Sequence, residues 1–344
     1  LLSREHHHLL QPTVYDFLLL MILNFIVGSV AKVRKRNDVM GGSARRNLVD
    51  SFNRQKKNED CFKIPLFGGL FRIFMNNQPL RPSISLPHEG PANISTYELT
   101  YALKSIHLNR VTDKIFIDEL RNEIEILKSL DHPHIVRPIE SFIHRHQLFI
   151  VMELCDGGDL YSRDPYTEED AARIVGSIVN AVSYMHRRNI VHRDLKYENI
   201  LFVNESPRAE IKLIDFGLSK KYASDKELTE GVGTIYTMAP EVFQGNYSAK
   251  ADLWSIGVIA YMLLSSQMPF YGRKRLDIVK NIMKCQYDFK GRRWKRVSAQ
   301  ARTFVEDLLV FDVQDRLDAD QALHSIWLNK SFAATIRGPT ILKS

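Results

Sequence analysis

The chain has 344 residues, 44% of them hydrophobic and 25% charged, so it can bury a large core and fits one two-lobed domain with an extension better than two unrelated domains. Its three cysteines lie far apart and form neither a disulfide framework nor a metal-binding pattern, which favours a reducing compartment. The net charge of +7 does not indicate a nucleic-acid binder, because the basic excess of residues 32–57 accounts for it and leaves the rest balanced.

An apolar stretch runs from Phe17 to Ala31, and four basic residues follow it between Lys32 and Arg36. Its fifteen residues are fewer than the about 20 that a helix needs to cross a bilayer. Three interpretations fit. The stretch is a membrane anchor with its basic side in the cytoplasm, a secretory signal ending in a cleavage-like S-V-A, or translated non-coding sequence. Residues 1–31 are therefore assigned as an apolar N-terminal segment.

Residues 32–93 mix charge runs, glycine pairs and prolines without sustained periodicity, which is typical of a linker. Basic residues beside an apolar stretch can also contact anionic lipid, although a solvated tail is the more common outcome. The sequence thus leaves membrane contact through this region open, with the rest of the chain on the cytoplasmic side.

The next two elements carry a lysine and a glutamate. Tyr101–Ile106 alternates in polarity, which predicts a strand that includes Lys104. Between Leu120 and Leu127, apolar residues recur at helical spacing, and Glu123 lies beside that apolar face. A strand followed by an amphipathic helix is therefore expected here.

Three further elements follow. Leu148–Leu160 is an apolar run that ends in a glycine-containing turn, which predicts a buried strand. Thr167 is a good N-cap, because three acidic residues follow it in the first turn of a helix that ends near Arg187. Residues 252–264 form an almost uninterrupted apolar helix, too hydrophobic to lie on a surface.

Polar residues gather in the stretch Ile190–Asn199, which reads I-V-H-R-D-L-K-Y-E-N and lies between two buried elements. It contains Asp194, Lys196 and Asn199 within six residues, and Asp215 follows sixteen residues later in I-D-F-G. One carboxylate can orient a hydroxyl, an amine can contact a γ-phosphate, and two oxygen ligands can hold Mg²⁺. These residues at this spacing indicate phosphoryl transfer.

These motifs, together with A-P-E at Ala239–Glu241, resemble the eukaryotic protein kinases. The wording K-L-I-D-F-G-L-S-K-K-Y and A-D-L-W-S-I-G-V-I-A-Y-M-L-L is similar to the calcium- and calmodulin-dependent group, especially the calcium-dependent protein kinases of plants and protists. The resemblance covers roughly Tyr97 to Phe332. It implies an α+β bilobal fold with a small β-rich lobe at 94–154, a large helical lobe at 155–332 and a tail at 333–344.

The resemblance also implies a catalytic set. Asp194 would orient the substrate hydroxyl and accept its proton, Lys196 would stabilise the migrating phosphoryl group, and Thr234 would hydrogen-bond near both. Asn199 and Asp215 would hold Mg²⁺. His192 is expected to be structural and to pack near Phe216. The lysine and Thr234 favour Ser/Thr over Tyr as the acceptor.

The implied ATP pocket comes next. Lys104 would hold the α- and β-phosphates while paired with Glu123. Met152 would lie beside the adenine, and the backbone of Glu153 and Cys155 would hydrogen-bond it. Two apolar residues complete the predicted pocket, Ala102 and Leu201.

One departure from the family pattern concerns the glycine-rich loop, expected about twenty residues before Lys104. That stretch reads R-P-S-I-S-L-P-H-E-G-P, with one glycine and three prolines, which lack the amide that such a loop must offer. Either the first two strands are rebuilt, or the sequence that encodes them is missing. The alternative function is therefore a pseudokinase or scaffold with impaired ATP binding.

Other expectations concern control and substrate. Glu230 stands where many kinases carry a phosphorylated threonine, so it would pair with Arg193 without phosphorylation. Asp159 and Glu198 match positions that receive a substrate arginine, although solvated surface charges are the plainer interpretation. Buried Asp252 would fasten the catalytic loop, and an architectural ion pair is expected to join Glu241 and Arg316. No EF-hand loop pattern occurs in the chain, so calcium control from within it is unsupported.

Overall fold

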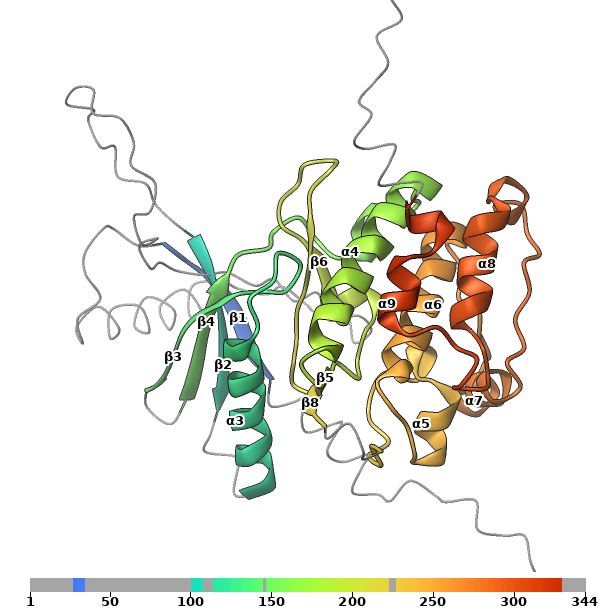
Figure 1. The fold of residues 1–344 in the computed structure, drawn as a ribbon. Helices are drawn as coiled ribbons and strands as arrows, with labels where there is room; N and C mark the ends of the chain where they lie inside the picture. The colour runs from blue at the N-terminus through green and yellow to red at the C-terminus, as the bar shows by residue number, and fades with distance from the viewer. Residues whose placement is uncertain (1–26, 35–99, 108–113, 145–146, 223–226, 330–344) are drawn as a thin grey trace, which may run out of the picture.

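The computed structural model describes residues 27–34, 100–107, 114–144, 147–222 and 227–329. Within these ranges the chain forms a small, strand-rich lobe and a large, mainly helical lobe (Figure 1). The predicted α+β bilobal fold is confirmed.

A four-stranded antiparallel sheet forms the small lobe. Its strands stand in the order β1-β2-β4-β3, with helix α3 (Lys114–Ser129) beside them in Figure 1. The strand bounds are β1 (Val27–Arg34), β2 (Thr100–His107), β3 (Pro138–His144) and β4 (Gln147–Glu153). Lys104 lies on β2, directly opposite Ile150 of β4, so the lysine stands in the middle of the sheet.

Strand β1 corrects two predicted boundaries. It crosses the division between the apolar segment at 1–31 and the linker at 32–93, and it pairs with β2 from Arg34↔Thr100 to Val27↔Ile106. The prediction that the small lobe begins at residue 94 is wrong for this strand. Three valines in eight residues suit a strand, and a sheet partner far along the chain was available to them. The rest of the apolar stretch and residues 35–99 lie outside the described residues.

Within the ranges that the structure describes, no helix combines the length and apolar character that crossing a bilayer requires.

The pairing of β1 with β2 predicts that the segment between them is dispensable. Arg34 and Thr100 are direct partners in an antiparallel ladder, and a two-residue turn can join such a pair. We expect that replacing residues 35–99 with Asn-Gly leaves the free energy of unfolding unchanged or raises it by up to about 3 kcal/mol, because each halving of loop length removes about 0.6 kcal/mol of closure cost. Urea unfolding of the full chain measures this.

The control variant lacks residues 1–99 and therefore strand β1 as well. It should be less stable than the parent, because one edge of β2 loses its ladder. A deletion of 35–99 that unfolds the protein as severely as this control would show that β1 does not pair with β2.

The large lobe is built around helix α6 (Lys250–Ser265). Every residue of α6 after Lys250 is buried, which confirms the predicted central helix. Helix α4 (Glu168–His186) packs on it, and the hydroxyl of Thr167 accepts a hydrogen bond from the Asp170 backbone N–H at 3.1 Å, as predicted for its N-cap. The other helices are α5 (Pro240–Gln244), α7 (Arg275–Met283), α8 (Ala299–Leu308) and α9 (Ala319–Leu323), with short 3₁₀ turns η2 (Leu160–Arg163), η3 (Tyr197–Asn199), η4 (Ile235–Thr237) and η5 (Trp294–Arg296).

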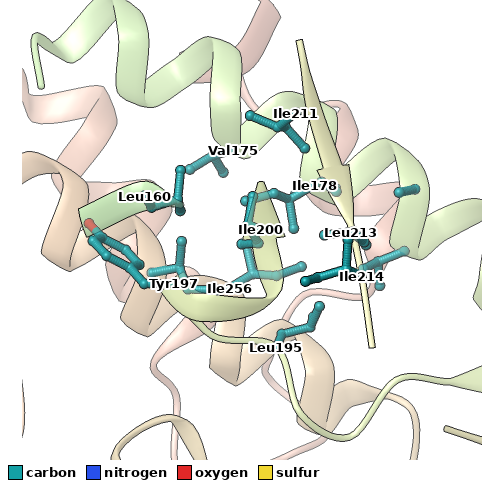
Figure 2. Close-up of a cluster of buried hydrophobic side chains, with 14 of the residues drawn as sticks. Leu160, Val175, Ile178, Leu195, Tyr197, Ile200, Ile211, Leu213, Ile214 and Ile256 are labelled. Carbon is teal, nitrogen blue, oxygen red and sulfur yellow. The ribbon is translucent and has the colours of Figure 1, made fainter. Parts of the chain in front are cut away.

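Two short antiparallel ribbons lie on the side of the large lobe that faces the small lobe (Figure 1). They pair β5 (Ile190–Val191) with β8 (Lys220–Lys221), and β6 (Ile200–Phe202) with β7 (Ile211–Leu213). Figure 2 shows the apolar cluster beneath them, where Leu195 and Ile200 lie near Ile178 of α4 and Ile256 of α6. These apolar residues alternate in sequence with the polar ones of the loop, so burying them fixes where the polar side chains stand.

Candidate active site

The central loop is held from behind by Asp252 of α6. Its Oδ2 accepts the backbone N–H of His192 at 2.9 Å, and its Oδ1 accepts that of Arg193 at 2.9 Å. Burial would raise the pKa of Asp252, but its hydrogen bonds with His186 and with the His192 backbone N–H lower it overall, so the carboxylate stays ionised. The prediction that Asp252 fastens this loop is confirmed.

Asp194, Lys196 and Thr234 form a closed triangle of polar contacts. Lys196 Nζ lies 2.7 Å from Asp194 Oδ2, and the Thr234 hydroxyl donates to Asp194 Oδ1 at 2.6 Å. Lys196 Nζ also donates to Thr234 Oγ1 at 3.0 Å. Burial would lower the pKa of Lys196, but the charge of Asp194 and its hydrogen bond raise it overall, so the ammonium stays charged. The predicted approach of Thr234 to the other two residues is confirmed.

A second cluster joins the two lobes. Lys104 Nζ donates to Glu123 Oε1 at 2.6 Å and lies 3.4 Å from Asp215 Oδ1. Burial would lower the pKa of Lys104, but the charges of the two carboxylates raise it overall. Burial would likewise raise the pKa of Asp215, and the charges of Lys104 and Lys196 lower it overall. The predicted Lys104–Glu123 pair is present, with Asp215 beside it.

The oxygens of Asn199 and Asp215 fit a divalent cation. Asn199 donates its amide to the Asp194 carbonyl at 2.9 Å and to Asp194 Oδ2 at 3.1 Å, which leaves its buried Oδ1 without a hydrogen-bond partner. Asp215 adopts a left-handed backbone with φ of 61°, a conformation that Asp tolerates better than most residues. No group of three or more His, Cys, Asp or Glu suited to a metal occurs in the described ranges. Two protein oxygens suit Mg²⁺, which keeps several waters and binds phosphates.

The residues predicted to contact adenine are apolar and buried, but they come from both lobes. Ala102 and Met152 are direct partners across β2 and β4, and Leu201 lies on β6 of the large lobe. The side chain of Glu153 accepts from the Arg137 backbone N–H at 2.7 Å and from Lys212 Nζ at 2.5 Å, which holds the end of β4 in place. Burial raises the pKa of the Cys155 thiol to about 12, so this cysteine is not a nucleophile.

His192 is a structural residue, as predicted. Its ring centroid lies 5.1 Å from that of Phe216, and its Nδ1 accepts the Asp194 backbone N–H at 3.3 Å. Burial lowers the pKa of His192, which keeps the ring neutral. A neutral ring that accepts this hydrogen bond orients the backbone of Asp194.

Glu230 lies in the stretch from Asp215 to Glu241, which corresponds to the activation segment of the kinases that the sequence resembles, and it attaches this stretch to Arg193 of the Ile190–Asn199 loop. Arg193 NH1 lies 3.0 Å from Glu230 Oε2, which confirms the predicted pair. Lys220 of β8 binds the other oxygen of Glu230, and Tyr247 donates its hydroxyl to the Glu230 carbonyl at 2.8 Å. Burial would raise the pKa of Glu230, but Lys220 and Arg193 lower it overall. Sequence reasoning missed Lys220 and Tyr247, and the only signal was the K-K pair five residues after Asp215.

Comparison with known proteins agrees with this geometry. The family model for the protein kinase domain matches residues 93–328. The chain is 40% identical over 235 residues to CDPK-related kinase 4 of Arabidopsis thaliana, covering 67% of this chain and 40% of that protein. It is 36% identical over 289 residues to calcium-dependent protein kinase 3 of Plasmodium berghei (strain Anka), covering 80% of this chain and 51% of that protein.

A third relative, a CDPK-related protein kinase of Daucus carota, is 39% identical over 236 residues, covering 67% of this chain and 39% of that protein. The chain therefore spans about 40–50% of the length of these curated relatives. The match to the kinase domain extends over both clusters of polar residues described above. The chain belongs to the protein kinase family, in its calcium-dependent protein kinase group.

Proposed function

We propose that this protein is a Ser/Thr protein kinase that transfers the γ-phosphate of ATP to protein hydroxyl groups. The observation that carries the proposal is the Asp194–Lys196–Thr234 triangle, whose Lys196 charge also lowers the pKa of Asp215 in the Lys104–Glu123–Asp215 cluster. A carboxylate acceptor, two ammonium groups and two oxygen ligands are the parts that phosphoryl transfer requires. A cytoplasmic location belongs to the same proposal, supported by the isolated cysteines.

Each residue has a distinct task in this mechanism. Asp194 Oδ1, which accepts a hydrogen bond from the Thr234 hydroxyl, is an oxygen that can orient a substrate hydroxyl and take its proton. Lys196 places a positive charge beside that oxygen and beside the incoming phosphoryl group. Lys104, aligned by Glu123, binds the phosphates that remain on the nucleotide.

Mg²⁺ would bind at Asn199 and Asp215 and would neutralise phosphate charge. The free Oδ1 of Asn199 and the lowered pKa of Asp215 support this assignment. The protein's own contribution is to fix both oxygens. The Asp194 contacts hold the Asn199 amide, and Lys104 with the Gly217 backbone N–H holds the Asp215 carboxylate.

Two carboxylates support a preference for basic residues near the acceptor. Burial raises the pKa of Asp159, and the charge of Glu198 also raises it, so the two acidic groups repel each other. The Tyr236 hydroxyl donates to Glu198 Oε2 at 2.7 Å and orients this carboxylate beside the η4 turn. A substrate arginine would relieve the repulsion and could bind either group through paired hydrogen bonds.

The second candidate function is a pseudokinase or scaffold, which the proline-rich segment before β2 favours. That segment lies outside the described residues. Strand β1 counts against this candidate, because it covers the edge of β2 and gives the lysine strand a neighbour on each side. The presence of both polar clusters also supports an active kinase over a pseudokinase.

The test is phosphorylation by the full chain with Mg-ATP. A peptide with Arg three residues before Ser should be phosphorylated, while the same peptide with Ala for Arg or Tyr for Ser should react more slowly. Asp194→Asn is the inactive control. Equal phosphate incorporation by the parent and by Asp194→Asn would overturn the proposal that the protein is a kinase. Equal rates on the Arg and Ala peptides would overturn only the basic preference.

The Arg193–Glu230 pair predicts activity without activation-segment phosphorylation. We expect Glu230→Ala to lower kcat/KM by about tenfold, because a hydrogen bond to a charged group contributes about 1.5–3 kcal/mol and the loss leaves Arg193 and Lys220 unpaired. Phosphatase treatment should leave the parent rate unchanged. Peptide phosphorylation measures both.

The matched control is Glu227→Ala, which removes an exposed carboxylate from the same segment and should keep the parent rate. The prediction that Glu230 orders this segment without phosphorylation is wrong if phosphatase treatment abolishes the activity of the parent. It is also wrong if Glu230→Ala is as active as Glu227→Ala.

A further inference from the structure

A short stretch of the large lobe is both basic and apolar on its exterior. Residues 271–280 read Y-G-R-K-R-L-D-I-V-K, with four basic residues and one acidic residue. Tyr271 is 75% exposed and Leu276 is 78% exposed, the two highest values among the large hydrophobic side chains in the described ranges. Exposed apolar surface that is rimmed by polar and charged side chains often marks an interaction site.

Helix α7 makes few internal contacts for its length. Ile282 is the one fully buried residue of the nine in α7, and the remainder are exposed or half-buried. The Asn281 side chain donates to the Tyr271 carbonyl at 2.8 Å and so fixes the loop that carries Tyr271 to the helix. The outer face of α7 is therefore ordered but not covered.

Three cations of the stretch 271–280 are exposed and lack an ion pair within the described ranges. Arg273, Lys274 and Lys280 form no ion pair with any residue in the described ranges, and all three are exposed. The acidic residue of the stretch, Asp277, accepts the Lys274 backbone N–H at 3.1 Å and caps the helix. We define the α7 surface as Tyr271, Arg273, Lys274, Leu276 and Lys280.

The position of this surface connects it to the substrate. Helix α7 packs against η4 and α5, and Figure 1 shows α5 and α7 as neighbours at one end of the large lobe. The η4 turn begins directly after Thr234, whose hydroxyl contacts Asp194. The η4 turn therefore connects the residue that contacts Asp194 with the helix that carries this surface.

We propose that the α7 surface is a docking site for an acidic segment of the protein substrate, with Asp or Glu residues beside at least one large apolar side chain. The proposal rests on the proposed kinase function and narrows its substrate class. The acidic pair Asp159 and Glu198 would attract a basic segment near the acceptor, whereas the α7 surface would attract an acidic one further along the substrate.

A protein segment fits this surface better than other anions do. Tight binding to DNA uses about 6–10 phosphate contacts, and recruitment to anionic lipid uses clusters of about 4–8 basic residues. The α7 surface offers two large exposed apolar side chains and three cations that form no ion pair within the described ranges. A peptide can satisfy both kinds of group at once, since charges set the approach and apolar side chains add buried area.

The first experiment compares two peptide substrates. The short one carries Arg-X-X-Ser, and the long one adds a Gly-Ser spacer and an Asp-Glu-Phe-Asp-Leu-Glu segment after Ser. In the variant Arg273→Glu/Lys274→Glu, we expect KM for the long peptide to rise about tenfold with kcat unchanged, and KM for the short peptide to stay at the parent value. The control Lys128→Glu/Arg208→Glu changes the same charge at exposed sites elsewhere and should match the parent on both peptides.

The second experiment measures binding without catalysis, so that it stands even if no peptide is phosphorylated. The long peptide with Ala for Ser carries fluorescein, and anisotropy reports its binding to the full chain. Weaker binding by the variant than by the parent and the control supports the docking site. Equal binding by all three overturns it. Binding of phosphatidylserine vesicles that the variant loses, without any peptide binding, also overturns it and assigns the surface to a membrane.

Discussion

Replacing Asp194 with Asn is expected to lower kcat by about 10²–10⁴-fold, the usual contribution of a positioned general base. The substitution keeps the size of the side chain, and the amide oxygen can still accept from the Thr234 hydroxyl. What it removes is the charge that accepts the substrate proton and pairs with Lys196 at 2.7 Å. The measurement is the initial rate of Ser-peptide phosphorylation by the full chain, with the dissociation constant of ATP determined in parallel.

The dissociation constant of ATP should change little, because Lys104, assigned to the nucleotide phosphates, and Asp215, assigned to Mg²⁺, keep their contact with each other. Glu205→Gln is the matched control: it removes one carboxylate from the exposed turn between β6 and β7 and should retain the parent rate. Melting temperatures of both variants exclude unfolding as the cause. A variant Asp194→Asn with the rate of Glu205→Gln would show that Asp194 is not the proton acceptor.

Much of this site follows from short-range sequence patterns. Asp194, Lys196 and Asn199 lie in one loop whose apolar neighbours are buried on both sides, so their spacing largely fixes how they meet. Glu123 was predictable in the same way, because a helical apolar face determines where its remaining positions point. The association of Lys104 with Glu123 came instead from the resemblance of the surrounding sequence to the protein kinases, because the spacing of a lysine and a glutamate carries no information by itself.

The strand β1 could not be predicted in that way. Its partner β2 begins 66 residues after Arg34, and pairing at that separation depends on which sheet edge is free after the rest of the lobe has folded. An apolar run of fifteen residues is also compatible with either a membrane segment or a β-strand together with the residues that precede it. Deciding between these two structures requires knowing that one edge of β2 is free to pair, and no local sequence pattern contains that information.

The overall charge balance of the chain concealed the cationic stretch at residues 271–280. The excess of basic over acidic residues between positions 32 and 57 equals the net charge of the chain, so the net charge of the remaining residues is zero. That sum includes the cationic stretch 271–280 and the acidic residues that offset it elsewhere. The exposure of Tyr271 and Leu276 depends on how α7 is seated, because an amphipathic pattern does not show which faces find a partner.

The second large effect concerns the ion pair between Arg316 and Glu241, predicted as architectural and confirmed as fully buried. The guanidinium donates to both Glu241 oxygens, at 2.5 and 3.0 Å, and to the carbonyls of Val310 and Lys250. Its carbon atom lies 5.1 Å from the centre of the Trp254 ring. We expect Arg316→Met to lower the free energy of unfolding by about 3–5 kcal/mol, because the substitution leaves the buried Glu241 carboxyl group without its ion-pair partner. Urea unfolding of the full chain measures the change.

Three further variants separate the buried charge from the lost volume. Arg316→Met combined with Glu241→Gln should recover part of the stability, since the double change leaves no unpaired ion. The free energy of unfolding of Arg316→Lys should lie between those of the parent and Arg316→Met, because lysine keeps the positive charge but cannot bind both Glu241 oxygens in the same geometry. Arg187→Met, which breaks the exposed pair with Asp320, should cost no more than about 1 kcal/mol. If Arg316→Met costs no more than Arg187→Met, the buried pair does not stabilise the contact between α5 and the segment that carries Arg316.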